Sequence, residues 1–435
     1  MFFQETIRRS AGRLFRLVSA VALFAVYCTY AAENEKFPGP QINRLLDMFE
    51  PAPEPANPPW MVASPQTGAR FEISNADVLT PGLVLLSGNR PGGQPFVDVV
   101  ERDGSLVQSW QPEFAKVWPD QSPEDPKGTG VLEGAQILAN GDLVFAFSRH
   151  SSVRLDACGN TKWKLSNQAH DSIFVSREGN LWIAGAQDIP AEGTGHVNLG
   201  LDVIDDVIQE VSPEGKVLRA FRVLDLLRDN DLLGLIYLAS IDDAGTDVAG
   251  DLLHVSSVAV YEDAAGPGPF ARGDVLVSFR NTSTIIVFDP ATRRVKYHLT
   301  GHFLRQGDVD YAGPRQLLIF DNRNLEPARE QSDPGSRIVM LDVTSGDKTV
   351  LFEGTSSKPF YSATFGQVEM TANGNLMIAS SREARAFELT PDGNVAWHFR
   401  NADDEGRAGV VTGAMVLPEE FDSEFFAVAR KECGA

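Results

Sequence analysis

Two of the seven histidines stand where chemistry is expected, each directly before a short apolar stretch. His170 precedes Asp171 and residues 172–175, and His254 precedes Val255. An imidazole, with an unperturbed pKa of about 6.5, can act as a nucleophile or exchange a proton near neutral pH. Histidines that only make structural hydrogen bonds would give the same pattern, so the sequence leaves both interpretations open.

The elements that must position these histidines are predicted by a recurring turn of the form Asp/Asn/Glu-Gly-X, flanked by short apolar strands. Glycine tolerates the positive φ that a tight hairpin turn requires. Neighbouring copies lie roughly 20 or 40 residues apart, which suits half a blade and a whole blade of a propeller. The copies are Asp103-Gly104, Asn140-Gly141, Glu178-Gly179, Glu214-Gly215, Asn373-Gly374 and Asp392-Gly393. The sequence therefore predicts an all-β fold, a β-propeller rather than a β-sandwich, whose inner strands point the two histidines into a central funnel.

Two further patterns refine this prediction. Apolar residues at spacings of three and four predict one helix over residues 221–235, packed outside a blade. Four aromatic residues recur at the same position in the predicted blade repeat, and we interpret them as core residues between blades rather than as a cofactor site. They are Trp163, Tyr297, Phe352 and Trp397.

The amino-terminal segment predicts export. Residues 1–32 contain four arginines followed by an uncharged apolar run, which is typical of a signal anchor or of a cleaved signal peptide. Residues 33–59 are a proline-rich linker, and residues 60–435 form the propeller domain. We expect a single-pass membrane protein with the propeller in the periplasm or outside the cell. The net charge of −21 argues against a nucleic-acid partner, while a protein partner stays open.

Cysteine usage limits the cofactors. Only Cys158 and Cys433 lie outside the apolar segment, and they could form one disulfide or remain separate thiols. The chain has no Cys-X-X-Cys pair and no histidine-rich metal spacing, so we expect no metal site and no cofactor.

The chain resembles the bacterial arylsulfotransferases, propeller enzymes that use phenolic sulfate esters as sulfuryl donors. The resemblance covers about residues 99–400, and it lies in the order of several short motifs rather than in any one of them. These are Leu155-Asp156-Ala157-Cys158 with Trp163, His170-Asp171, Gly179-Asn180 with Trp182, His254, Ser278-Phe279-Arg280-Asn281, Gln306-Gly307-Asp308, Phe320-Asp321-Asn322, Ser336-Arg337, Tyr361-Ser362 and Arg385-Ala386-Phe387-Glu388. The resemblance implies six four-stranded blades.

It also implies sulfuryl transfer from an aryl sulfate ester to a phenolic acceptor through a transiently sulfated histidine. Cations and strong donors must hold the sulfate oxygens, which suits histidine and arginine around a funnel. The catalytic residues implied by the resemblance are His170, His254 and Arg337. The substrate-binding residues are Arg280, Asn281, Arg305, Asp308 and Tyr361.

The sequence departs from the family pattern at Gly307, where the family has a histidine. No histidine occurs between His302 and His398, the stretch in which the family's nucleophile would be sought. We expect Gly307→His to raise any transfer rate and Arg337→Ala to abolish sulfate binding. The departure leaves enzymatic activity in doubt, so a non-catalytic, membrane-tethered propeller that binds or scaffolds a partner stays an alternative. A third hypothesis is a quinone-dependent dehydrogenase, and the lack of adjacent cysteines and of paired tryptophan repeats argues against it.

Overall fold

The six glycine turns predicted from the sequence all form tight hairpins. Each glycine has a φ between +75° and +90°, and its N–H donates to the carbonyl three residues earlier at 2.8–3.0 Å. The turns join either the first to the second or the third to the fourth strand of a blade. Since successive strands are antiparallel, these turns share one face of the ring, and the other connections, which carry the histidines, share the opposite face.

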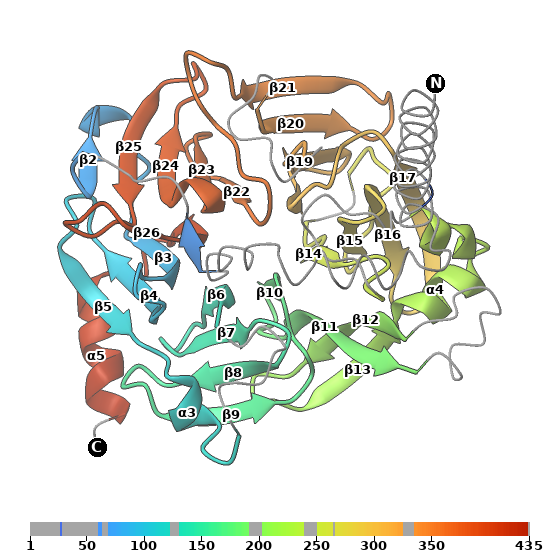
Figure 1. Ribbon diagram of the computed structural model, residues 1–435, viewed down its shortest axis with the longest axis horizontal. Helices are drawn as coiled ribbons and strands as arrows, with labels where there is room; N and C mark the ends of the chain where they lie inside the picture. The colour runs from blue at the N-terminus through green and yellow to red at the C-terminus, as the bar shows by residue number, and fades with distance from the viewer. Residues whose placement is uncertain are drawn as a thin grey trace, which may run out of the picture. The chain divides into compact units, whose positions relative to one another are not determined.

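The computed structural model describes residues 60–62, 68–121, 130–190, 202–238, 250–263, 266–324 and 335–433, together with Tyr27. In these residues six sheets of four or five antiparallel strands form a ring around one axis (Figure 1), along which a propeller has its central channel. Each sheet is one blade, so the prediction of a six-bladed propeller is confirmed.

The blades follow the chain, and their strands run from the channel outwards. The first blade consists of β27 (Val411–Val416), β3 (Val84–Asn89), β4 (Pro95–Val100) and β5 (Leu106–Trp110). The second consists of β6 (Leu132–Ile137), β7 (Leu143–Phe147), β8 (Ser151–Leu155) and β9 (Thr161–Leu165). The third consists of β10 (Ile173–Val175), β11 (Leu181–Ile189), β12 (Val203–Val211) and β13 (Val217–Arg222).

The fourth blade consists of β14 (Val255–Val260), β15 (Val275–Phe279), β16 (Thr284–Asp289) and β17 (Arg294–Thr300). The fifth consists of β18 (Asp308–Tyr311), β19 (Gln316–Asp321), β20 (Arg337–Asp342) and β21 (Lys348–Glu353). The sixth consists of β22 (Gln367–Met370), β23 (Leu376–Ser380), β24 (Arg385–Leu389), β25 (Val395–Arg400) and the outer strand β2 (Phe71–Ile73).

Both ends of the domain close the ring. The carboxy-terminal strand β27 pairs with β3, and the amino-terminal strand β2 pairs with β25, Phe71 opposite Phe399. A two-stranded ladder of β1 (Met61–Val62) and β26 (Ala408–Gly409) adds to this seam. Closure removes the open sheet edges that would otherwise pair with another chain.

Three of the four recurrent aromatic residues pack between blades, as predicted. The indole of Trp163 donates to the carbonyl of Pro213 in the third blade at 2.8 Å, and that of Trp397 donates to the carbonyl of Arg102, just after β4, at 2.8 Å. Phe352 lies 5.9 Å from the ring of Phe387 in the next blade. Apolar residues at the blade interfaces therefore supply the core, as burial of apolar area requires.

Short helices lie outside the sheets. They are η1 (Ala76–Val78), α3 (Phe114–Val117), α4 (Val223–Asp229), η3 (Leu233–Tyr237), η4 (Ser381–Glu383) and α5 (Ser423–Cys433). The single helix predicted over residues 221–235 is thus two short helices, because Asp231 has a φ of +58° that interrupts the helical path.

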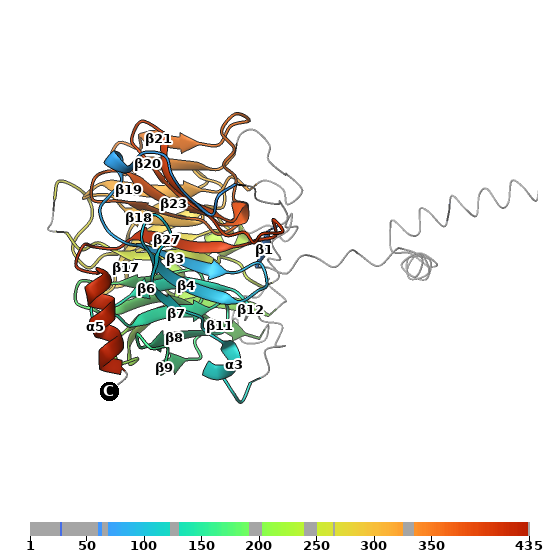
Figure 2. The same ribbon diagram turned by 90° about the vertical axis from the view of Figure 1, so that its left-hand side faces the viewer.

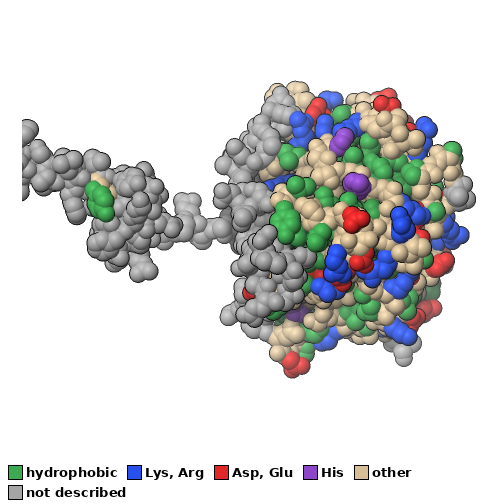
Figure 3. Space-filling view, turned by 90° about the vertical axis from the view of Figure 1, so that its right-hand side faces the viewer, with side chains coloured by type: hydrophobic (Ala, Val, Ile, Leu, Met, Phe, Trp, Pro, Cys, Tyr) green, Lys and Arg blue, Asp and Glu red, His purple; other side chains and the backbone are tan. Residues whose placement is uncertain are grey.

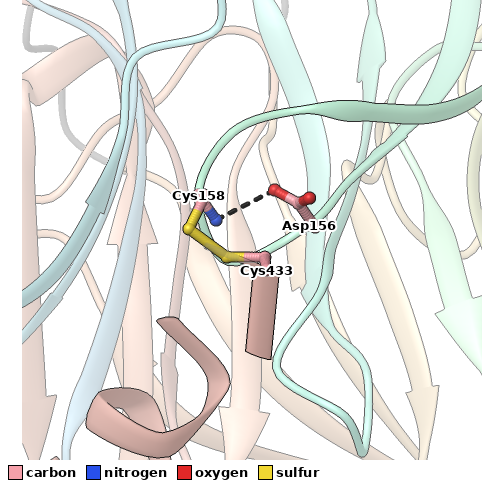
Figure 4. Close-up of side chains that lie close together, drawn as sticks. All are labelled: Asp156, Cys158 and Cys433. Carbon is pink, nitrogen blue, oxygen red and sulfur yellow. Dashed lines mark hydrogen bonds between the residues drawn. A yellow bond between two sulfur atoms is a disulfide. The ribbon is translucent and has the colours of Figure 1, made fainter. Parts of the chain in front are cut away.

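A disulfide joins the C-terminal helix to the second blade. Cys158, just after β8, is bonded to Cys433 at the end of α5, and Asp156 accepts a 2.9 Å hydrogen bond from the Cys158 N–H (Figure 4). Phe426 of α5 is fully buried against Trp110 of β5, so the helix lies along the outside of the first blade (Figure 2). The open question of whether the two cysteines pair is settled in favour of the bond.

The predicted membrane segment, residues 1–32, lies outside the described residues apart from Tyr27, and the whole linker, residues 33–59, also lies outside them. Among the helices that are described, none has the length and apolar character that crossing a bilayer would need.

Candidate functional site

The two histidines that the sequence singled out meet on the face of the ring opposite the glycine turns. His170 precedes β10 of the third blade and His254 precedes β14 of the fourth. Their ring centroids are 5.5 Å apart, and both side chains are buried, with exposed fractions of 1% and 7%. Neighbouring blades of one propeller therefore bring together residues that are distant in sequence.

His254 lies between two carboxylates. Its Nδ1 is 2.6 Å from Asp251 Oδ2, and its Nε2 is 2.9 Å from Asp171 Oδ2. Burial and the charge of Arg280 lower the pKa of His254, but Asp251 and Asp171 outweigh them, so its pKa is raised above the usual value. With a carboxylate at each nitrogen, the ring is best satisfied as a cation, and a cationic imidazole has no lone pair for nucleophilic attack.

His170 has a different environment. Its Nδ1 is 3.1 Å from the carbonyl oxygen of Gln168, which can only accept, so this nitrogen carries a proton. Its Nε2 lies 3.3 Å from Asp206 Oδ1 but makes no hydrogen bond with a described residue. Both carboxylate oxygens of the buried Asp206 also lack such a bond. His170 is therefore the member of the pair whose second nitrogen is buried without a hydrogen-bond partner among the described residues.

The backbone at this site adopts a conformation that L-residues rarely take. Asp171, His254 and Arg305 have φ values of +52°, +56° and +55°, each a few residues before an inner strand. Such conformations cost about 1–3 kcal/mol each and persist only where surrounding contacts hold them. At Asp171 this strained backbone occurs in a residue whose own side-chain carboxylate contacts Nε2 of His254, in the next blade.

Two arginines add positive charge. Arg149, after β7, forms an ion pair with Asp251 and lies 2.6 Å from His254 Nδ1. Arg280, after β15, donates through Nε to Asn281 Oδ1 at 3.1 Å and forms no ion pair with a described carboxylate. Burial lowers the pKa of Arg280, although Asp171 and Asp251 act in the opposite direction. Arg280 is thus the cation of the cluster that is free of a direct carboxylate partner in the part of the chain described.

Beneath the cluster, the inner strands line a narrow cavity of about 60 Å³ in the channel. Glu133 of β6 lines it and accepts the N–H of Asp171 at 2.7 Å. Burial, and then the charge of Asp171, raise the pKa of Glu133 to about 7. Asp308 of β18 also lines the cavity, and burial and the neighbouring Asp310 raise its pKa to about 7.

The substrate-binding residues predicted from the resemblance are only partly brought together. Asn281 donates to the Asp251 carbonyl at 2.6 Å, which places it beside the histidines as a support for Asp251 and Arg280. Arg305 lies close enough to Arg280 to lower its pKa by charge repulsion. Asp308 faces the channel cavity, and no hydrogen bond or ion pair among the described residues joins Tyr361 to either histidine.

The structure places Arg337 beside Asp321, whereas the sequence predicted it beside His170 and His254. Arg337 opens β20, the third strand of the fifth blade, and its Nε donates to Asp321 Oδ2 at 2.8 Å. Asp321 is fully buried and also accepts the N–H of Leu304 at 2.8 Å. In the described part of the chain Arg337 therefore compensates a buried carboxylate, and no contact links it to the histidine pair.

Gly307 is where backbones approach too closely for a side chain. A Cβ built on Gly307 would lie 2.3 Å from the carbonyl oxygen of Phe365 and 2.7 Å from Asn322 Oδ1. The expectation that Gly307→His would restore a catalytic group is therefore corrected, since the loop at Phe365 would first have to move.

Sequence reasoning overlooked Asp206, Asp251, Arg149 and Glu133. Asp251 had a usable signal, because it lies three residues before His254 in the same turn. The other three residues are far from both histidines in the sequence, and only the closed ring brings them close to the pair: Asp206, Arg149 and Glu133.

Comparison with known proteins is consistent with this arrangement. The sequence profile of the family described as Arylsulfotransferase (ASST) matches residues 134–402. No curated relative matches the chain in sequence.

Solved structures match the chain at low identity and with TM-scores below 0.5. A Bacteroides caccae protein of unknown function has 14% identity and a TM-score of 0.48, over 77% of this chain and 98% of its own. Kuenenia stuttgartiensis hydrazine synthase has 12% identity and a TM-score of 0.41, over 70% and 75%. Virginiamycin B lyase from Staphylococcus aureus has 11% identity and a TM-score of 0.38, over 75% and 88%. At these scores none of them bears on function.

Proposed function

Because this chain belongs to the arylsulfotransferase family, we propose that it transfers a sulfuryl group from an aryl sulfate ester to a phenolic acceptor at the His170–His254 pair. The observation that carries the proposal is the 5.5 Å approach of the two rings beside Arg280, a cation with no described carboxylate partner. A sulfuryl group carries negative oxygens, which such cations stabilise as charge develops.

In this proposal His170 is the nucleophile. Its Nδ1 proton is held by the Gln168 carbonyl, so the lone pair resides on Nε2. Attack by Nε2 on sulfur forms an N–S bond, breaks the bond from sulfur to the aryl oxygen and releases a phenolate. The acceptor phenol then attacks the same sulfur, the N–S bond breaks, and the acceptor's proton ends on the released phenolate.

The cationic neighbours have a separate task. Arg280 would face the sulfuryl oxygens and stabilise the transition state. His254, kept positive by Asp171 and Asp251, has both nitrogens held by these carboxylates and would contribute only the charge of its ring. Asn281 orients Arg280 through its amide oxygen. Neither His254 nor Arg280 needs to exchange a proton for this role.

Steady-state kinetics of the purified protein with 4-nitrophenyl sulfate and a phenol acceptor test the proposal. His170→Asn should abolish the release of 4-nitrophenolate, and Arg280→Gln should lower kcat/KM by about a hundredfold, as the loss of one transition-state donor does. His298→Asn, on the exposed edge of β17, and Arg315→Gln, an exposed residue paired with Asp342, serve as matched controls. Equal turnover by His170→Asn and the parent protein would contradict the assignment.

A second candidate, a non-catalytic propeller that binds an anionic ligand, is favoured by two observations. His170 is 1% exposed, and both nitrogens of His254 face carboxylates. Under this alternative the parent protein binds an aryl sulfate without turnover, and Arg280→Gln weakens the binding.

We also propose that the propeller acts outside the cytoplasm, held at the membrane by residues 1–32. The Cys158–Cys433 disulfide supports this, since such bonds persist mainly in oxidising compartments. Protease added to spheroplasts should digest the propeller. Digestion only after lysis would contradict the proposed location.

A further inference from the structure

A second basic site lies where the ring closes, away from the histidine pair. A pocket of about 530 Å³ opens between the sixth blade and the first, and four arginines line it: Arg70, Arg90, Arg400 and Arg407. Arg70 and Arg400 flank the β2–β25 ladder, whereas Arg90 follows β3. Figure 1 shows β25 of the sixth blade beside β3 and β4 of the first. The pocket has the volume of a site for a small organic molecule, which typically ranges from about 300 to 1,000 Å³.

The concentration of arginine here contrasts with the acidic net charge of the chain. The chain carries a net charge of −21. On the side of the propeller drawn in Figure 3, basic and acidic side chains lie among one another without a region of one sign. Four arginines and two aspartates, Asp403 and Asp404, line this one pocket, so arginines outnumber carboxylates in its lining.

Three of the arginines already have acidic neighbours. Arg90 pairs with Asp98, Arg407 lies 2.8 Å from Asp403, and Arg400 lies 3.4 Å from Glu72. Arg70 forms no ion pair with a described residue. Its guanidinium carbon is 5.7 Å from the ring centroids of both Phe71 and Phe399, which hold it over an aromatic surface.

Electrostatics agree with this geometry. Partial burial, and then the positive charge of Arg90, lower the pKa of Arg70, although Asp98, the ion-pair partner of Arg90, acts in the opposite direction. An anion between the two guanidinium groups would offset the repulsion that remains between them.

The walls of the pocket are fixed by hydrogen bonds. The side-chain amide of Asn401 donates to the carbonyls of Asn89 and Gly409 at 2.7 and 2.9 Å, which ties the end of β3 to the segment after β25. The N–H of Arg400 donates to the Arg70 carbonyl at 2.8 Å. A site whose walls are already held in place loses little entropy when it binds a ligand.

We propose that this arginine pocket binds a small oxyanion-bearing molecule, with a carboxylate, sulfate or phosphate group between Arg70 of the sixth blade and Arg90 of the first. Guanidinium groups match the planar, bidentate geometry of such oxygens. The bound anion links the first and last blades at the seam where the chain closes the ring. Binding therefore stabilises the closed propeller by mass action.

Isothermal titration calorimetry of the full-length protein with sodium sulfate tests this proposal, with sodium chloride at equal ionic strength as the reference. Sulfate should bind and raise the midpoint of thermal unfolding beyond the chloride reference. Arg70→Gln should weaken sulfate binding at least about tenfold, the value of one charge-assisted hydrogen bond. Arg70 is exposed and has no described ion pair, so this variant is expected to fold.

Two further variants separate this pocket from the histidine site. Arg315→Gln, a comparably exposed arginine, should leave sulfate binding unchanged, whereas Arg280→Gln should remove only binding that belongs to the histidine site and leave the Arg70-dependent binding in place. Sodium acetate and sodium phosphate, titrated in the same way, distinguish the oxyanion classes. The proposal is overturned if sulfate produces no binding beyond the chloride reference, or if Arg70→Gln binds sulfate as the parent does. It is also overturned if Arg280→Gln, and not Arg70→Gln, removes the binding.

Discussion

Asp171 Oδ2 lies 2.9 Å from His254 Nε2, and the two residues belong to the loops before the inner strands of adjacent blades. Asp171 itself follows His170 in the chain, so its carboxylate ties the loop that carries His170 to the side chain of His254. Since Asp251 holds the other nitrogen of His254, the imidazole is fixed in both orientation and charge. This contact makes the site a property of the ring and not of a single blade.

Asp171→Asn should destabilise the protein in a pH-dependent way. The folded-state pKa of His254 is raised above 6.5, so its stabilisation is complete below that pH and is lost as the pH rises through the raised value. The pKa of Asp171 is lowered from 3.8, so its contribution is lost as the pH falls. The loss on mutation should therefore be largest at about pH 5–6, about 3 kcal/mol for a broken buried pair, and smaller at pH 9. Urea unfolding at both pH values measures it, and an equal loss at both would contradict the account.

Glu369→Gln should stabilise the protein at pH 8 but not at pH 4.5. Burial, and then the charges of Asp310 and Asp308, raise the pKa of Glu369 from 4.5 to about 8. The folded protein therefore holds a proton that the unfolded chain releases, and stability falls as the pH rises between these values. Because glutamine does not titrate, the Glu369→Gln variant does not lose this stability as the pH rises. Thermal unfolding across this range should show it, with exposed Glu419→Gln giving no change; a stabilisation that does not vary with pH would speak against this assignment.

Reduction of the Cys158–Cys433 bond should lower stability. The bond closes a loop of 275 residues, and removal of a native disulfide typically costs about 2–5 kcal/mol. A thermal melt with and without reductant measures this loss. The Cys158→Ser/Cys433→Ser double variant should match the reduced protein and ignore the reductant. If reductant left the parent melt unchanged, the bond would not hold α5 in solution.

Gly307→Ala should destabilise the protein by about 1–3 kcal/mol, the usual cost of forcing an added group into a packed site. The new Cβ would meet the Phe365 carbonyl oxygen at 2.3 Å. Gly234→Ala, which adds a Cβ into open space, is the control and should be close to neutral. Urea denaturation compares the two, and equal stability of Gly307→Ala and the parent would show that the loop at Phe365 yields easily.

Local sequence patterns predicted the fold well because each one fixes a local structure. The glycine turns require a positive φ wherever they occur, and Trp163, Phe352 and Trp397 needed only their place in the blade to be assigned to interfaces. The break in the helix at Asp231 was missed, because its apolar spacing runs on through that residue.

The candidate site was predictable only in part. His170 and His254 share a position before an inner strand, and that position repeats in the sequence. Arginine is a residue type that binds sulfate, which is why the sequence pointed to Arg337. In the structure, however, Arg337 on β20 forms an ion pair with Asp321 on the neighbouring strand β19. Asp206 lies within a strand, and nothing in its neighbourhood in the sequence indicates that it faces His170. Such contacts depend on which blades become neighbours.

The most direct test of the central claim is mass spectrometry of the protein mixed with 4-nitrophenyl sulfate, quenched at alkaline pH and digested. The account predicts a sulfuryl group on the peptide that contains His170, and none on that peptide in His170→Asn. A parent protein without any sulfated peptide, or with the group on another residue, would contradict the assignment of His170 as the nucleophile.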